Sequence, residues 1–179
     1  MNIATAQADF GRAYAGGAAG VLVSGLVWLI AGLVWQTAGL ERAFVVLFIG
    51  GMAIHPLATL LTRFGLRCPP VNPTNPLTRL ALESTIALFV GIAIAFVLLM
   101  REPALAIPAF AGIVGARYFV FRTLFGTALF WVLGGAMAWV GVAALFGWVV
   151  PLGNMALHIG VIEVLFAAVL FARRRQSLV

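Results

Sequence analysis

The sequence predicts an all-α integral membrane protein, a bundle of six transmembrane helices arranged as three helical hairpins, with both termini in the cytoplasm. Of its 179 residues, 64% are hydrophobic and 9% are charged, and the mean hydropathy is +1.13. A soluble domain is about half apolar and about a quarter charged. The apolar residues form six long runs, and most arginines lie in the connections on one side. We therefore expect a single polytopic domain, residues 1–179.

The six runs have the length of membrane-spanning helices. Their expected spans are residues 18–35, 43–61, 80–100, 104–121, 124–150 and 154–172. About 20 apolar residues cross the hydrocarbon as a helix, and about 17 to 25 are tolerated. The runs do not alternate polar and apolar residues, as barrel strands would. Only Arg122 and Thr123 divide the fourth span from the fifth, which is long enough to tilt.

A proline-rich segment, residues 62–79, separates the second and third spans. Four prolines within eight residues prevent a helix there and favour an extended, stiff path. We interpret it as a rigid cytoplasmic connector, with a partner-binding stretch as the alternative. Cys68, the only cysteine, lies in this loop. The sequence has no CxxC, HExxH or phosphate-binding motif, so neither a metal site nor a cofactor is predicted.

The distribution of arginines predicts the orientation in the membrane. Eight of the eleven fall on the side of the two termini, and the opposite side holds Arg42 and Arg101, each beside a glutamate. The eight are Arg12, Arg63, Arg67, Arg79, Arg122, Arg173, Arg174 and Arg175. The positive-inside rule places that side in the cytoplasm of a bacterial inner membrane. The basic residues thus indicate the lipid bilayer as partner and not nucleic acid, which would need a basic patch on a solvated face.

Five ionisable residues lie inside the apolar runs: His55, Glu83, Arg117, His158 and Glu163. A charge at membrane depth costs about 3 kcal/mol or more unless it has a partner or a water-filled cavity. From the helical rise, His55 lies roughly 12 Å, Glu83 roughly 6 Å, Arg117 roughly 7 Å and Glu163 roughly 15 Å from the cytoplasmic end. We predict that these four form a buried polar cluster between helices.

Two interpretations of this cluster are open. In the functional one, Arg117 pairs with Glu83 or Glu163 at a cavity open to the cytoplasm, and His55 tunes or relays a proton. In the structural one, Arg117 forms a bridge that fixes helix packing, or reaches the headgroups. Glu163 and His55 are the deepest of the four, hence the strongest functional candidates. Secondary candidates are His158 with Asn154, one turn apart, and Tyr118, which we expect to anchor at the interface.

Small residues recur within the predicted helices. Gly16, Gly20 and Ser24 have the GxxxG spacing that lets helix backbones approach closely in lipid. Further glycines lie inside the other runs, at Gly50, Gly51, Gly112, Gly115, Gly134 and Gly135. We expect these faces to pack helices, with a homo-oligomer as one possible outcome.

The chain resembles a family of uncharacterised small bacterial multi-pass inner-membrane proteins, a domain of unknown function. The similar stretches are residues 20–29 (GVLVSGLVWL), 48–52 (FIGGM), 55–57 (HPL), 75–77 (NPL), 80–83 (LALE) and 115–118 (GARY). They cover the first two thirds of the chain and include His55, Glu83 and Arg117. The resemblance implies an integral membrane protein and transfers no activity.

The first functional hypothesis is a small-solute or ion transporter or channel-like protein, with proton coupling through glutamate and histidine. The second is a non-catalytic membrane scaffold or accessory subunit. It would show dry packing, paired charges and a glycine-lined face exposed to lipid. The third is an intramembrane lipid-modifying enzyme, which needs a lateral opening and a nucleophile or metal. Because no catalytic motif is present, we do not expect an enzyme.

Overall fold

The computed structural model describes residues 1–148 and 153–176, and side chains in the last helix up to residue 174. The described part is helical and contains no strand. The helices are α1 (Ile3–Ala13), α2 (Ala18–Ala38), α3 (Leu40–Leu60), α4 (Leu77–Arg101), α5 (Pro103–Phe125), α6 (Leu129–Leu145) and α7 (Met155–Gln176). A 3-10 turn, η1 (Ala15–Gly17), precedes α2, and a π-helical turn, η2 (Leu61–Gly65), follows α3.

Five of these helices are long and apolar enough to cross a membrane: α2 with η1, α3 with η2, α4, α5 and α7. The sixth, α6, has 17 residues and the highest mean apolarity of the set. Its length of roughly 25 Å is near the lower limit for a spanning helix. The predicted fifth span, 124–150, is therefore longer than the helix that forms. Its last two residues lie outside the described part of the chain.

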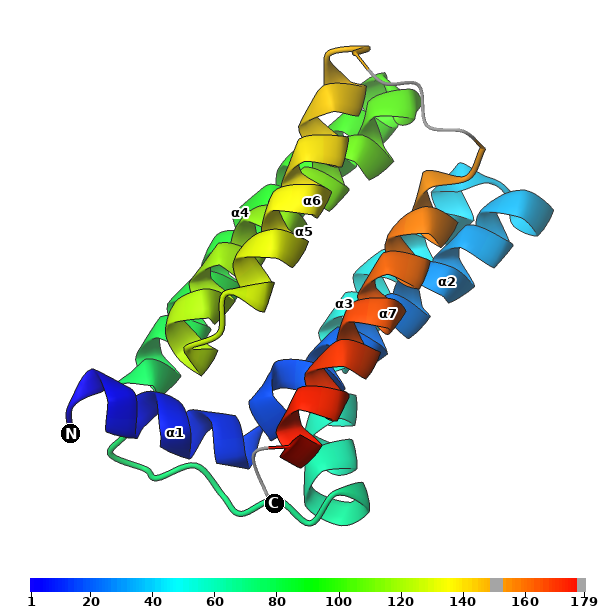
Figure 1. The fold of residues 1–179 in the computed structure, drawn as a ribbon. Helices are drawn as coiled ribbons and strands as arrows, with labels where there is room; N and C mark the ends of the chain where they lie inside the picture. Colours follow the sequence, from blue (N-terminus) through cyan, green and yellow to red (C-terminus); the bar gives the residue numbers. More distant parts are fainter. Residues whose placement is uncertain (149–152, 177–179) are drawn as a thin grey trace.

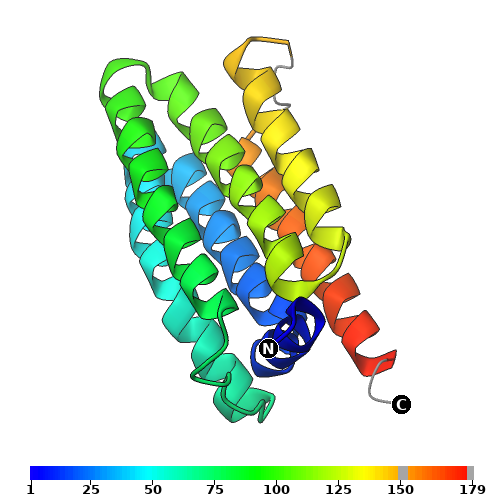
Figure 2. The ribbon, with the colours of Figure 1, turned by 90° about the vertical axis from the view of Figure 1, so that its left-hand side faces the viewer.

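The bundle has two layers of three helices (Figure 1). In one layer, α2 lies between α3 and α7, and in the other α5 lies between α4 and α6. Figure 2 shows the second layer in front of the first. The layers meet along one edge, where α7 contacts α5 and α6. Helix α1 crosses the end of the bundle near both termini and packs on α5 through Ala6 and Phe10.

The predicted third hairpin is wrong, because α6 packs along α5 and α7 packs along α2. Small residues explain the pairing. A Cβ atom on Gly141 would lie 2.5 Å from the backbone nitrogen of Gly112, on α5. A Cβ atom on Gly160 would lie 2.9 Å from the carbonyl oxygen of Gly25, on α2. Each helix therefore follows the partner whose backbone it can approach most closely.

The connections at the terminal end are tight. Ala15, Gly16 and Gly17 all have positive φ, which turns the chain sharply from α1 into α2. A side chain on Gly17 would also collide with the rings of Phe125 and Phe130. Helix α5 continues through the predicted break at Arg122 and Thr123. It ends at Gly126, which adopts the left-handed conformation (φ 73°) and caps the helix through the carbonyl of Arg122.

The non-helical part of the proline-rich segment, residues 66–76, is docked onto α1. Asp9 Oδ2 accepts hydrogen bonds from the Asn72 backbone nitrogen at 3.0 Å and from Asn75 Nδ2 at 2.8 Å. Asn75 Nδ2 also donates to the carbonyl of Ala6, and its Oδ1 accepts from the Leu77 backbone at the start of α4. The stiff connector thus fixes α1 to the beginning of α4.

We expect acid to release this connector. The hydrogen bond from Asn75, then that from Asn72, holds the pKa of Asp9 below its ordinary value of 3.8. A lowered pKa means that docking is stabilised while the carboxylate is ionised. This stabilisation is present above the ordinary pKa and is lost as the pH falls through the lowered one. Amide hydrogen exchange at Asn72, corrected for its intrinsic pH dependence, should stay slow down to about pH 4 and become faster below that.

Asp9→Ala is the matched variant for this prediction. It removes the acceptor for both bonds, so Asn72 should exchange quickly at every pH. Protection of Asn72 that is independent of pH in the wild-type protein, or unchanged in Asp9→Ala, would show that the connector is held by other contacts.

Candidate functional site

A cavity of about 640 Å³ lies between the two layers. Its walls come from α2 and α3 on one side and from α4 and α5 on the other, and residues of α1 and η1 line its end near the termini. At the opposite end, a cluster of aromatic rings fills the space between the layers. The ring centroid of Phe110 lies 5.4 Å from that of Trp28 and 6.0 Å from that of Phe44. The cavity therefore extends inward from the terminal, arginine-rich end of the bundle and stops at this aromatic cluster.

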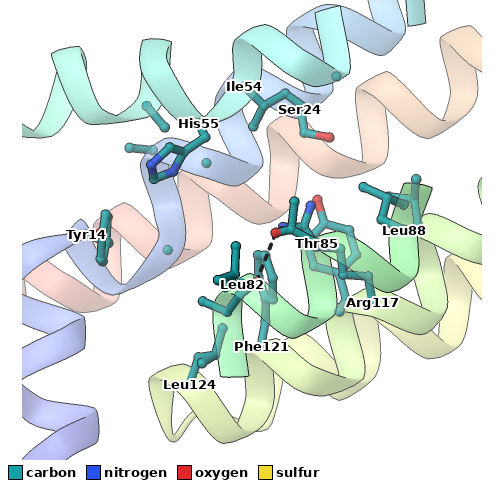
Figure 3. Close-up of a pocket in the computed structure, with 18 of the residues that line it drawn as sticks. Tyr14, Ser24, Ile54, His55, Leu82, Thr85, Leu88, Arg117, Phe121 and Leu124 are labelled. Carbon is teal, nitrogen blue, oxygen red and sulfur yellow. Dashed lines mark hydrogen bonds between the residues drawn. The ribbon is translucent and has the colours of Figure 1, made fainter. Parts of the chain in front are cut away.

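Arg117, on α5, is the partly buried cation in the cavity wall, and Arg79, at the start of α4, is a second and exposed one. Its Nη2 donates a hydrogen bond of 2.8 Å to Thr85 Oγ1, and its guanidinium lies 5.3 Å from the centre of the Phe121 ring (Figure 3). Its Nε is buried and has no hydrogen-bond partner among the described residues. The predicted pairing with Glu83 or Glu163 is not formed, and within the described chain no carboxylate lies in ion-pair range of Arg117. A partly buried positive charge, without a carboxylate to compensate it among the described residues, thus lies in the cavity wall.

Glu163 lies behind the cavity wall. It is fully buried, on the side of α7 that packs against α2. Its Oε1 accepts a hydrogen bond of 2.7 Å from the hydroxyl of Tyr118. Its Oε2 is buried without a hydrogen-bond partner in the described part of the protein. Tyr118 and Ser24 line the cavity and both lie against Glu163, so these two side chains separate Glu163 from that space. The expected interfacial role of Tyr118 is wrong, because its side chain is buried.

His55 lines the cavity from α3, across from Arg117 (Figure 3). Its ring lies 6.4 Å from that of Tyr14, which follows α1. Pro56 comes next in the chain and lies inside α3. The cavity therefore has a polar region at mid-depth and towards the termini, formed by side chains from both layers. The remaining lining is dominated by Val, Leu, Ile, Met and Phe.

The other predicted residues lie outside this space. Glu83 is exposed on α4, and His158 is exposed on α7; neither lines the cavity. Asn154 Oδ1 accepts from the backbone nitrogens of Ala156 and Leu157 at the start of α7, and its Nδ2 donates to the carbonyl of Gly32. Asn154 therefore caps α7 and ties it to α2. The predicted cluster of four separates into Arg117 and His55 in the cavity, Glu163 behind it, and Glu83 outside.

The sequence alone did not identify Thr85, Ser24 or Tyr14 as site residues. Thr85 and Ser24 are hydroxyl residues within apolar runs, a type that often bonds to its own helix backbone. Thr85 does so, with the carbonyl of Ala81, and in addition accepts from Arg117. Among the described residues, no three His, Cys, Asp or Glu side chains converge in a way that could hold a metal ion.

One comparison with known proteins identifies a relationship. The sequence model of a family of unknown function, DUF7010, matches residues 3–173. This range extends beyond the stretches on which the resemblance was based and includes α7 with Glu163. No curated protein and no solved structure matches the chain.

Proposed function

Since the chain belongs to DUF7010, a family of unknown function, we propose its activity from the site itself: a small membrane transporter whose substrate occupies the cavity between the two helix layers. The observation that carries the proposal is Arg117, a partly buried cation without an acidic partner in the described chain, in the wall of a cavity of about 640 Å³. A charged group at membrane depth needs a partner or water. A scaffold would be expected to pair such a charge with a carboxylate, whereas Arg117 has only the Thr85 hydroxyl and the Phe121 ring.

In this proposal all six long helices, α2 to α7, cross a bacterial inner membrane, with the arginine-rich end in the cytoplasm. The cavity is then the cytoplasm-facing state, and the cluster around Trp28 and Phe110 closes the outer side. The helix packing supports a mechanism in which the two layers move relative to each other. Close glycine contacts unite the helices within each layer, whereas between layers the contacts lie mainly along α7. Each layer can therefore move as a unit.

Proton coupling forms part of the same proposal. Glu163 is separated from the cavity by the side chains of Tyr118 and Ser24 and has no cationic partner in the described chain. An ionised carboxylate in that position costs several kcal/mol. A rearrangement of the layers that brings water to Glu163 would let it release a proton, and closure would favour taking one up.

Thiol labelling tests whether the cavity is open to the cytoplasm. In a Cys68→Ser background, we place a cysteine at Leu88, which lines the cavity, or at Ile86, which faces outward on the same helix and is 58% exposed. A thiol reacts through its thiolate, which requires water. A membrane-impermeant maleimide should label Leu88→Cys from the cytoplasmic side of inverted vesicles and leave Ile86→Cys unlabelled.

The outcomes separate the functional hypotheses. Labelling of Leu88→Cys from the cytoplasmic side supports a hydrated cavity. Absence of labelling from either side would favour the scaffold. Labelling from the opposite side alone would overturn the proposed orientation.

A further inference from the structure

We propose that the cavity binds a single-chain amphiphile with a carboxylate head, such as a long-chain fatty acid, which enters sideways between α3 and α4. This inference rests on the proposed function, because it takes the same cavity as the substrate site and names the substrate class. Three features support it: an apolar lining, an uncompensated cation and an opening towards lipid.

The opening lies at the edge of the bundle opposite α7. The layers are in contact along α7, whereas α3 does not pack along α4. Three cavity-lining residues on these two helices have large exposed fractions: Met52 is 59%, Leu82 is 61% and Phe89 is 51% exposed. The two helices approach each other farther from the termini, where the rings of Phe44 and Phe96 lie 6.5 Å apart. A molecule in the bilayer can therefore reach the cavity laterally.

The chemistry of the walls selects an anionic head on an apolar chain. Beyond Arg117, the lining continues towards the aromatic cluster through Val114, Leu88 and Ile92. From Arg117 to Phe110 the distance along α5 is about 10 Å, enough for several methylene groups. A neutral solute would leave the guanidinium uncompensated, and a small inorganic anion would leave the apolar wall unfilled. An acyl chain with a negative head group compensates the guanidinium and also fills the apolar part of the cavity.

The guanidinium favours a planar carboxylate. Nη2 is engaged with Thr85, which fixes the plane of the group, and Nε has no partner. Nε is shielded from the cavity, whereas Nη1 and the second N–H of Nη2 can donate two parallel hydrogen bonds to the oxygens of one carboxylate. A volume of about 640 Å³ lies within the range of single small-ligand sites. This favours one acyl chain over a two-chain phospholipid.

Binding of radiolabelled palmitate to the full-length protein in phosphatidylcholine nanodiscs tests the proposal. Arg117→Gln should weaken binding by about tenfold or more, since a charge-assisted pair is lost. Arg122→Gln is the matched control. Arg122 lies at the same end of α5 as Arg117, but it does not line the cavity. Its guanidinium lies 5.8 Å from the centre of the Trp131 ring. This variant should bind within about twofold of wild type.

A second variant does not depend on Arg117. Gly51 lines the cavity, and a Cβ atom there would meet nothing within 4 Å. Gly51→Trp should therefore fold and obstruct the opening, and palmitate should bind more slowly. Unlabelled palmitate should compete, whereas hexadecanol, which lacks the charge, should compete poorly.

The inference is overturned if Arg117→Gln and Arg122→Gln lose binding equally, because the effect would then be general surface charge. It is also overturned if hexadecanol competes as well as palmitate, or if phosphatidylglycerol competes better. Each of these results leaves the labelling of Leu88→Cys intact, so a wrong substrate class is distinguishable from a wrong proposed function. Absence of palmitate binding together with labelled Leu88→Cys would indicate a transporter for another solute.

Discussion

Replacing Gly134 by leucine should unfold the second helix layer, whereas the same change at the next residue, Gly135, should be tolerated. A Cβ atom on Gly134 would lie 2.7 Å from the carbonyl oxygen of Gly115 and 3.0 Å from Tyr118 Cβ. The first contact is with backbone, which cannot move aside as a flexible side chain would. The expected loss is about 3 kcal/mol of unfolding free energy or more, the upper part of the range for overpacking. It should be visible as a lowered thermal midpoint in detergent.

Gly135 provides a control on the same helix. A Cβ atom there would meet nothing within 4 Å, so a leucine would lie towards lipid. Leucine also favours a helix over glycine by roughly 0.8 kcal/mol. Gly135→Leu should therefore match or exceed wild-type stability. Equal losses of unfolding free energy in both variants would mean that the close contact between α5 and α6 does not determine the stability of the layer. A loss confined to Gly135→Leu would instead indicate a homo-oligomer that buries this face.

The helical membrane-protein class could be predicted from sequence because it depends on composition and run length alone. Five of the six expected spans correspond to helices that are long and apolar enough to cross a membrane, because such spans follow from counting apolar residues along the chain. The turn after the fourth span could not be placed from Arg122 and Thr123, since two polar residues can sit on a helix surface. The chain turns instead at Gly126, where a residue with positive φ is required.

Helix pairing could not be predicted, because it depends on which glycines meet across the chain. The glycines of α5, α6 and α7 look alike in sequence, and hairpin formation is the simplest expectation for neighbours. The contacts of Gly25 with Glu163 and Val164, on α7, are made across nearly the whole length of the chain. The cavity could not be predicted from the sequence either, because a leucine that lines a cavity and a leucine that packs in a core look the same in a sequence. Arg117 and Tyr118 are consecutive on α5 and point about 100° apart around the helix, so Tyr118 meets Glu163 while Arg117 meets Thr85.

Tyr118→Phe should destabilise the protein and identify what Glu163 does. The change removes the 2.7 Å hydrogen bond to Glu163 Oε1 and leaves the carboxyl group buried with both oxygens unpartnered. A buried polar group that loses its partner costs about 1–3 kcal/mol. Glu163→Gln keeps an oxygen that can accept from Tyr118 and should cost less. Chemical unfolding of the purified variants in detergent measures both values.

A double-mutant cycle isolates the pair. If the bond is the main loss, Tyr118→Phe combined with Glu163→Leu should be more stable than Tyr118→Phe alone, because no polar group then remains unpaired. If the stability loss of the double variant equals the sum of the losses in the two single variants, the hydrogen bond contributes little to stability. Packing of Glu163 against α2 would then dominate.

The same variants separate a proton site from a structural clamp. Glu163→Gln preserves the shape and the hydrogen bond with Tyr118 but cannot exchange a proton in the physiological range. If Glu163 couples transport to protons, this variant should stay folded and keep palmitate binding while losing the dependence of palmitate uptake on a pH gradient. If Glu163 only clamps α7 to α5, Glu163→Gln should behave as wild type, and Glu163→Leu should alter stability alone. Glu163 lies behind the cavity wall and not in it, so the affinity for palmitate should be unchanged in either case. A large loss of palmitate affinity in Glu163→Gln would contradict the assignment of the anion site to Arg117.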